Sequence, residues 1–260
     1  MTAAAARADG SAPELLDTLA ADRATGALTT RSGVFYLAAG HVVHVESAHS
    51  PAFGDLLTRS GALAPAGWWE AVERAGARQR VGRQLVDSGR LTAGALELAH
   101  LGALFDAAYF ALAHDGTDLR FRPGVAHWLG AVRPVTVATV LRESYRRRAL
   151  LDSIWPDAAV DTAPLARTPD ADPAVLPPRR GRALALVDGG RTAAQIASVL
   201  AHRTFHTLVE LRRLAADGLV VPAPPVPAPP VHPVPGAGRA DWDEPDAALL
   251  RRLLDALEAL

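Results

Sequence analysis

The sequence predicts an α+β fold: a small antiparallel meander packed with helical repeats, followed by a mostly helical second domain. Three observations carry this prediction. Residues 26–47 hold three runs of β-branched and aromatic residues that recur at period 2, separated by glycine turns. Residues 54–101 contain an internal repeat of helical character. Residues 177–222 hold three short helical patterns with clear start and stop signals.

Composition limits the function classes before any element is assigned. The 260 residues include no cysteine, which excludes a disulfide scaffold, a thiolate zinc site and a thiol nucleophile. The 27 basic and 28 acidic residues give a net charge of −1, which argues against nucleic-acid binding along the whole chain. The N-terminus has no apolar core of a signal peptide, and no apolar run is long enough to span a membrane. We therefore expect a cytoplasmic protein with no membrane contact.

Charge and proline content divide the chain. Residues 177–222 carry seven arginines against three acids, whereas residues 157–176 carry one arginine against four aspartates. The segment 222–238 contains eight prolines, which favours a stiff polyproline II spacer over a proline-motif ligand. The resulting prediction is a disordered N-terminus (1–13), an α+β domain (14–156), an acidic linker (157–176), a helical domain (177–222), a proline-rich spacer (223–240) and an amphipathic C-terminal helix (241–260).

The α+β domain is predicted to begin with a short helix over 14–21. The runs 26–32, 33–39 and 41–47 then form consecutive strands. Alternation places Val34 and Tyr36 on one face of the middle strand, with Phe35 and Leu37 on the other. The glycines between the runs supply the turns of an antiparallel meander.

The internal repeat aligns 54–73 with 82–101, with glycine, leucine and serine coinciding at five positions. Each copy predicts a helix, a glycine C-cap, a leucine and a new helix. Gly61 and Gly89 supply the left-handed conformation that ends the first helix of each copy. Further along, 103–114 continues as helix, 118–124 is a strand and 135–155 is a long helix.

At this point the sequence resembles a family. The run GVFYLAAGHVVHVESAHSPAFGDLLTRSG, with its Val43-His44 pair and Gly54, is similar to the signature of the PATAN domain. The later LRFRPG and LRESYRRRALLDSI resemble the ending of that domain, so that the resemblance covers about 14–155. It implies an α+β interaction or regulatory module of bacterial signalling proteins, without known catalysis.

The histidines offer a functional alternative. His41, His44 and His49 cluster in sequence, and Glu46 is the only carboxylate at ligand spacing. On a strand, positions 41 and 44 point to opposite faces, so only a bulge would bring them together, and a structural role is favoured over a metal site. The remaining candidates, His100, His114 and His127, have no ligand spacing. Since no catalytic motif is present either, we expect no catalytic residues, no metal, no cofactor and no enzyme activity.

One ligand hypothesis comes from the repeat, which resembles the tandem cyclic di-GMP motif of MshE-type secretion ATPases. The second copy matches the motif's arginine, glycines and leucines at Arg80, Gly82, Leu85, Gly89 and Leu96. In the first copy Ala52 stands where the motif has an arginine. Losing a guanidinium that can stack on and hydrogen-bond guanine removes affinity, so nucleotide binding ranks third among the functions.

Within 177–222, Gly181–Val187 predicts a first helix and the capping box Thr192/Gln195 opens a second over 193–200. Thr204 is expected to cap a third helix that runs to Ala216, followed by a terminal strand. Helix, helix, turn, helix and strand in about 45 residues resembles a winged-helix domain. It also resembles the small helix–turn–helix modules that accompany PATAN domains.

Whether this module contacts DNA or protein stays open. Candidate DNA-binding residues are Arg179, Arg180, Arg182, Arg191, Arg203, His206, Thr207, Arg212 and Arg213. Against DNA stand Glu210 within the would-be recognition helix, the modest charge of +4, and the lack of a second strand for a wing.

The C-terminal segment predicts an amphipathic helix with one apolar stripe. The stripe consists of Leu249, Leu250, Leu253, Leu254, Leu257 and Leu260. It can fold back on its own domains, pair with a second copy to give a homodimer, or dock in a partner's groove.

Together these observations predict a non-catalytic bacterial regulatory protein, a transcriptional or signalling regulator that couples a PATAN-like domain to a winged-helix-like module. The alternative is a protein–protein interaction adaptor whose degenerate winged helix binds no DNA, and the third is a cyclic di-GMP effector. Another protein is the expected partner, through the PATAN-like domain or the C-terminal helix.

Overall fold

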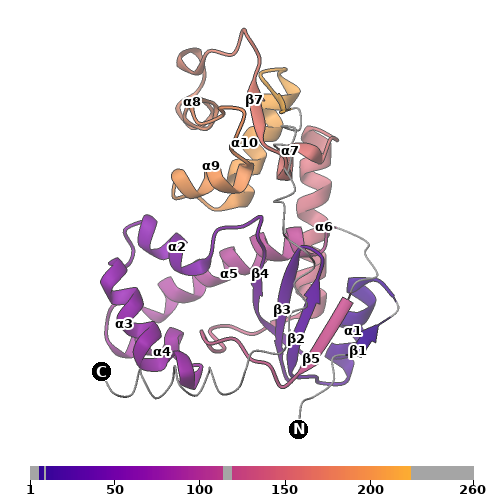
Figure 1. Cartoon of the computed structure of the whole chain (residues 1–260), viewed down its shortest axis with the longest axis vertical. Coiled ribbons are helices and arrows are strands. Elements are labelled where there is room, and N and C mark those ends of the chain that lie inside the picture. Colours follow the sequence, from indigo (N-terminus) through magenta and orange to yellow (C-terminus); the bar gives the residue numbers. More distant parts are fainter. Residues whose placement is uncertain (1–5, 9, 114–118, 224–260) are drawn as a thin grey trace, which may run out of the picture. The chain divides into compact units, whose positions relative to one another are not determined.

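A computed structural model describes residues 6–8, 10–113 and 119–223 of the chain, and the described residues up to Ala223 belong to one compact unit (Figure 1). The proline-rich spacer beyond Ala223, the C-terminal helix with its six leucines, and His114 lie outside the described residues. The fold is α+β, as the sequence predicts.

Six strands form an antiparallel sheet in the order β1-β5-β2-β3-β4-β6. In chain order the strands are β1 (Ala6–Ala8), β2 (Gly26–Thr30), β3 (Gly33–Ala38), β4 (His41–Glu46), β5 (Leu119–Pro123) and β6 (Val135–Thr136). The predicted meander is confirmed as β2-β3-β4. The segment 1–13 is predicted to be disordered, but it contributes β1 and the first residues of α1 (Ala12–Ala21). The helix begins there because Ser11 forms a capping box with Glu14.

One face of the sheet is covered by α1, α5 (Ala93–Ala111) and α6 (Val137–Ile154), which together enclose the first core. Phe35 and Leu37 are fully buried there, on the face opposite Tyr36, as the strand alternation predicts. The second half of α5, from Gly102 to Ala111, is buried on most sides, because α5 contacts both the sheet and the helices α2, α4 and α6.

The internal repeat forms α2 (Phe53–Arg59), α3 (Pro65–Ala75), η1 (Gly76–Arg78), α4 (Val81–Asp87) and the beginning of α5. Gly61 and Gly89 end α2 and α4 with φ of +74° and +69°, which confirms the predicted left-handed C-caps. Gly54 is required for close packing, since a Cβ there would lie 2.4 Å from the Trp68 indole. This helical layer has its own core and lies beside the sheet (Figure 1).

The winged-helix-like module consists of α8 (Pro178–Ala185), α9 (Ala193–Val199), α10 (Thr204–Ala216) and β8 (Val220–Pro222). The capping box of Thr192 with Gln195 is confirmed, whereas α10 is preceded by Arg203 as N-cap instead of Thr204. Thr204 is the first helical residue and is fully buried, and no side chain caps the beginning of this helix.

Residues 157–176, for which the sequence predicts an acidic linker, contain α7 (Ala159–Thr162), β7 (Leu165–Arg167) and η2 (Pro173–Val175). β7 pairs antiparallel with β8 and so supplies the second strand that the sequence did not reveal. Asp161 of α7 is buried because the fully buried guanidinium of Arg212 on α10 pairs with both of its oxygens, at 2.7 and 2.8 Å.

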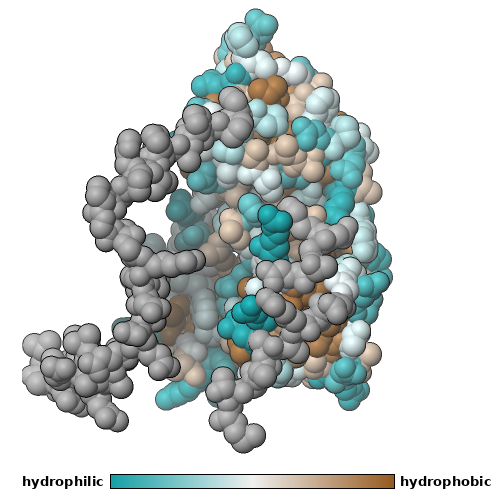
Figure 2. Space-filling model, turned by 45° about the vertical axis from the view of Figure 1, so that its right-hand side comes forward, coloured by the Kyte–Doolittle hydropathy of each residue, from teal (hydrophilic) through white to brown (hydrophobic). Residues whose placement is uncertain are grey.

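Most large hydrophobic side chains are inside these cores. On the face shown in Figure 2, hydrophobic residues occur in small groups among hydrophilic ones. The exposed exceptions include Trp69, with 67% of its surface accessible, and Trp128 with 37%. Both of them line a cavity of about 670 Å³.

Candidate functional site

A cavity of about 670 Å³ lies between the β3–β4 part of the sheet, the helices α2 and α3, and the loop that follows β5. Its volume is in the range of small-molecule sites. The aromatic part of its wall comes from Phe53, Trp68, Trp69 and Trp128, and its polar part includes His44, Glu46 and His127. The indoles of Trp68 and Trp128 meet edge to face, with ring centroids 5.6 Å apart.

Two buried histidines, His44 and His127, line this cavity, and a third buried histidine, His100, contacts His44. The ring of His44 on β4 stacks on His127 at a centroid distance of 4.0 Å and on His100 of α5 at 5.3 Å. Nδ1 of His44 lies 3.1 Å from Nε2 of His100, so one of these nitrogens donates to the other. The three imidazoles form a stack that connects the sheet, α5 and the loop after β5.

Among the described residues, Glu46 is the one carboxylate in contact with this stack. Its Oε1 lies 3.1 Å from Nε2 of His127, and its Oε2 accepts a hydrogen bond from the Tyr36 hydroxyl at 3.1 Å. The hydrogen bond from His127 is the main reason that the pKa of Glu46 is lowered. Burial, followed by the charge of His127, holds the pKa of His44 well below its usual value and lowers that of His100 to about 4. At neutral pH the site therefore combines neutral His44 and His100 with an ionised carboxylate.

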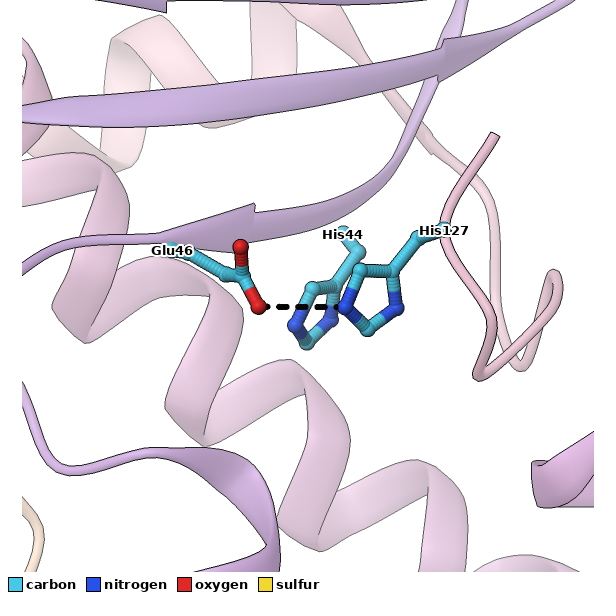
Figure 3. A group of neighbouring side chains, drawn as sticks. All are labelled: His44, Glu46 and His127. Carbon is cyan, nitrogen blue, oxygen red and sulfur yellow. Dashed lines mark hydrogen bonds and ion pairs between the residues drawn. The ribbon is translucent and has the colours of Figure 1, made fainter. Parts of the chain in front are cut away.

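His44, Glu46 and His127 are the group that comes closest to a metal site, with one nitrogen or oxygen of each within 4.8 Å of the others (Figure 3). The geometry does not fit a metal ion. The planes of His44 and His127 differ by 24° and are stacked, whereas a metal at about 2.0–2.1 Å must lie near the plane of every imidazole that binds it. In addition, the Leu129 amide donates to Nδ1 of His127 at 3.2 Å, which leaves the ring proton on Nε2, where the metal would bind. In this arrangement His44 and His127 are stacked rings, and His127 is hydrogen-bonded to Glu46.

The sequence contained only part of this arrangement. His41 is exposed, whereas His44 is buried. The prediction that they point to opposite faces of β4 is wrong, because a register shift opposite Tyr36 and Leu37 pairs His41 with Ala38 and His44 with Tyr36, on the same face of β3. His44 and Glu46 share a face of β4 because they are two residues apart, and this was the available signal. His127 and His100 lie far away in the sequence and gave no ligand spacing, so the stack could not be found from the sequence.

The candidate DNA-binding residues fall into two groups. Five of them line a second cavity of about 400 Å³ between α8 and the beginning of α10, namely Arg179, Arg182, Arg203, His206 and Thr207. The other four have carboxylate partners: Arg180 with Asp217 at 2.6 Å, Arg191 with Asp188 at 3.0 Å, Arg213 with Glu210 at 3.1 Å, and Arg212 with Asp161. Arg212 is fully buried and cannot contact DNA in this structure, so its prediction as a DNA-binding residue is wrong.

The first turn of α10 is held against α5 and α6. Oδ2 of Asp106 on α5 accepts a hydrogen bond from the Phe205 amide at 3.2 Å, and its Oδ1 pairs with Arg147 of α6 at 2.7 Å. Arg147 also places its guanidinium 4.4 Å from the Phe205 ring centroid. Arg203 donates to the Leu98 carbonyl of α5 at 3.0 Å. The end of the helix that a winged helix inserts into DNA is thus partly covered by the N-terminal part of the fold.

The candidate nucleotide-binding residues serve packing instead of forming one surface. Leu85 is fully buried, and the Gly82 amide donates to the Leu129 carbonyl at 3.0 Å. A Cβ at Gly82 would lie 2.8 Å from Val132. Only Arg80 and Gly89 are exposed. The spacing of the repeat is therefore explained by helix packing.

Comparisons with known proteins add no assignment. No family model matches the sequence, and no significant similarity is found among curated proteins or solved structures. None of the helices within the described residues is long and apolar enough to cross a membrane.

Proposed function

We propose that this chain is a non-catalytic regulatory protein in which a PATAN-like lobe, made of the sheet and the helical repeat, takes up a signal in its aromatic cavity and passes it to the winged-helix-like module. The observation that carries this proposal is the position of α5. Ala103 and Ala107 line the cavity on one side of the helix. The residues that precede these alanines contact the module: Gly102 lies close to the Arg203 guanidinium, and Asp106 accepts a hydrogen bond from the Phe205 amide.

This arrangement gives a physical route for coupling. Gly102 and Asp106 face the module across a close contact, and a Cβ at Gly102 would lie 2.4 Å from the Arg203 guanidinium. A ligand that moves α5 therefore changes the contact with α10, because packed interfaces respond to displacements of about 1 Å. Regulation requires such a difference between two states of the same interface.

The covered first turn of α10 supports the adaptor form of this function, in which the module meets another protein and no DNA. DNA contact remains the second candidate because five of the nine candidate residues gather at one basic cavity. Cyclic di-GMP binding is the third, and the buried Gly82 and Leu85 do not support it.

The experiment uses the full chain with 8-anilinonaphthalene-1-sulfonate, an aromatic probe of apolar cavities, and measures its fluorescence together with amide hydrogen exchange. We expect the probe to bind, the Trp128→Ala variant to bind it several-fold more weakly, and exchange at the Phe205 amide to change on binding. In the Asp106→Asn variant, which keeps the side-chain shape, the probe should bind normally while the change at Phe205 is reduced.

Several outcomes would contradict the proposal. Equal binding by wild type and Trp128→Ala would place the probe elsewhere, and unchanged exchange at Phe205 would remove the coupling. A salt-dependent mobility shift with duplex DNA would favour the second candidate. Heat on calorimetric titration with cyclic di-GMP at tens of micromolar would favour the third.

A further inference from the structure

The cavity between α8 and the first turns of α10 combines a surplus of positive charge with a buried hydroxyl group that has no partner within the described residues. We propose that it is a binding site for a phosphate monoester. Its walls include Arg179, Arg182, His202, Arg203 and His206, together with the side chain of Thr207. This inference does not depend on the signal route through α5, because it concerns different residues and a different ligand.

The arginines of this cavity lack the carboxylate partners that the neighbouring arginines have. Within the described residues, Arg179, Arg182 and Arg203 form no ion pair, and the latter two donate only to the backbone carbonyls of Pro178 and Leu98. Of the described residues in the wall, Glu210 is the one acid, and it already pairs with Arg180 at 3.8 Å and with Arg213 at 3.1 Å. The guanidinium groups are therefore free to bind an anion with their paired N–H donors.

The lowered pKa of His202 is consistent with a positive electrostatic potential in this cavity. Burial lowers its pKa first, and the charges of Arg182, His206 and Arg179 lower it further, with no acid acting in the opposite direction. If carboxylates neutralised Arg179 and Arg182, these arginines would not lower the pKa of His202. The cavity is therefore an uncompensated positive region, to which a multiply charged anion is attracted.

Thr207 provides the second, independent observation. The residue is 2% exposed and is among those that line the cavity, and its Oγ1 has no hydrogen-bond partner among the described residues. A buried hydroxyl without a partner is unfavourable. An anion oxygen in the cavity would accept this hydrogen bond.

A phosphate monoester fits these features better than a carboxylate or a duplex. It carries close to two negative charges and three strong acceptor oxygens, enough for several arginines and the hydroxyl at once. The cavity volume of about 400 Å³ admits such a group together with part of its carrier. Arg203, held by the Leu98 carbonyl, connects one wall to α5 and limits the approach of a rigid duplex.

The test is calorimetric titration of the full chain, at low ionic strength, with inorganic phosphate, phosphoserine and adenosine 5′-monophosphate. We expect all three to bind and Arg182→Ala to weaken them about tenfold. Thr207→Val, which keeps the side-chain shape, should weaken them several-fold without loss of the folded circular dichroism spectrum. Arg167→Ala is the matched control, because it removes the same charge from an exposed residue of β7 outside the cavity.

Binding that Arg167→Ala retains and Arg182→Ala loses would support the site. Stronger binding of either phosphoserine or the nucleotide would identify the source of the phosphate. Equal binding by all variants would show non-specific attraction, and no heat with any of the three compounds would end the proposal. Salt-dependent binding of duplex DNA without binding of the small phosphates would also overturn it in favour of a DNA-contacting face.

Discussion

Only one of the three stacked histidines has a carboxylate partner among the described residues, and this affects how the fold responds to acid. His100 is fully buried and its neighbours are the imidazoles of His44 on β4 and His127 in the loop after β5, with the Phe53 ring edge-on to it. Glu46 contacts His127 and no other member of the stack within the described residues. A proton added to His100 is therefore unfavourable, because the residue is buried beside other imidazoles and no described carboxylate is in contact with it.

The first prediction concerns this acid response. The pKa of His100 is about 4 in the folded protein, against 6.5 for an ordinary histidine. As the pH falls from 6.5 to 4, the unfolded chain binds a proton that the folded protein does not, so stability is lost in this window. The shift corresponds to a loss of roughly 3 kcal/mol. Urea unfolding at both pH values should show it.

The control for this prediction is His100→Gln, which retains a hydrogen-bonding side chain but does not titrate. Carboxylates elsewhere also contribute to acid lability, so the measured quantity is the difference between the two proteins in the stability lost from pH 6.5 to 4. If the variant loses as much free energy of unfolding as the wild type, His100 is not responsible.

At the scale of single elements, two glycines of the repeat, Gly61 and Gly94, differ in backbone conformation. Gly61 has φ of +74°, a left-handed conformation, and open space around it. Gly94, in the first turn of α5, also has open space but an ordinary backbone conformation. Backbone strain, and not crowding, therefore decides the effect of adding a methyl group at each position.

From this difference we predict that Gly61→Ala lowers the free energy of unfolding by about 1 kcal/mol, whereas Gly94→Ala raises it by about 0.5 kcal/mol. Gly61→Asn should recover part of the loss, because asparagine tolerates the left-handed conformation. Chemical denaturation of the three variants measures these changes. A loss at Gly94 as large as that at Gly61 would contradict the argument.

The elements that the sequence predicted are those with local signals. The strands β2, β3 and β4 follow from period-2 alternation, and the ends of α2 and α4 follow from Gly61 and Gly89. β7 could not be predicted in this way, because Leu165–Arg167 is too short for a periodicity and its partner β8 is distant in the sequence. The burial of Asp161 is favourable only because it pairs with Arg212, 51 residues away. No local signal reveals this contact, so the sequence analysis assigned Asp161 to a linker.

The same limit applies to the candidate site. The charge pattern of the basic module was visible, but which arginines are neutralised depends on tertiary contacts, as Arg212 and Arg180 show. Likewise, Glu46 and His127 are 81 residues apart. Sequence periodicity identifies faces of elements, whereas a site assembled from several elements requires their packing.

At the scale of the whole molecule, the winged-helix-like module has no complete core of its own. Tyr109 and Phe110 of α5 and Leu151 of α6 belong to the same buried cluster as the apolar residues of α8, α9 and α10. The buried Arg212 depends on Asp161 of α7, and the Tyr109 hydroxyl donates to that carboxylate at 2.5 Å. Removing one partner of a buried ion pair costs about 3–5 kcal/mol, which is comparable to the whole stability of a domain this small.

We therefore expect a fragment of residues 177–223 to be unfolded, and a fragment of 157–223 to be only partly ordered, because it regains Asp161 and β7 but not Tyr109, Phe110 and Leu151. Residues 1–223 should unfold in a single cooperative transition. Circular dichroism and the dispersion of amide proton resonances distinguish these cases. A well-dispersed spectrum from 177–223 would show that the module is an independent domain, and a signal in the aromatic cavity would then have no buried core through which to reach α10.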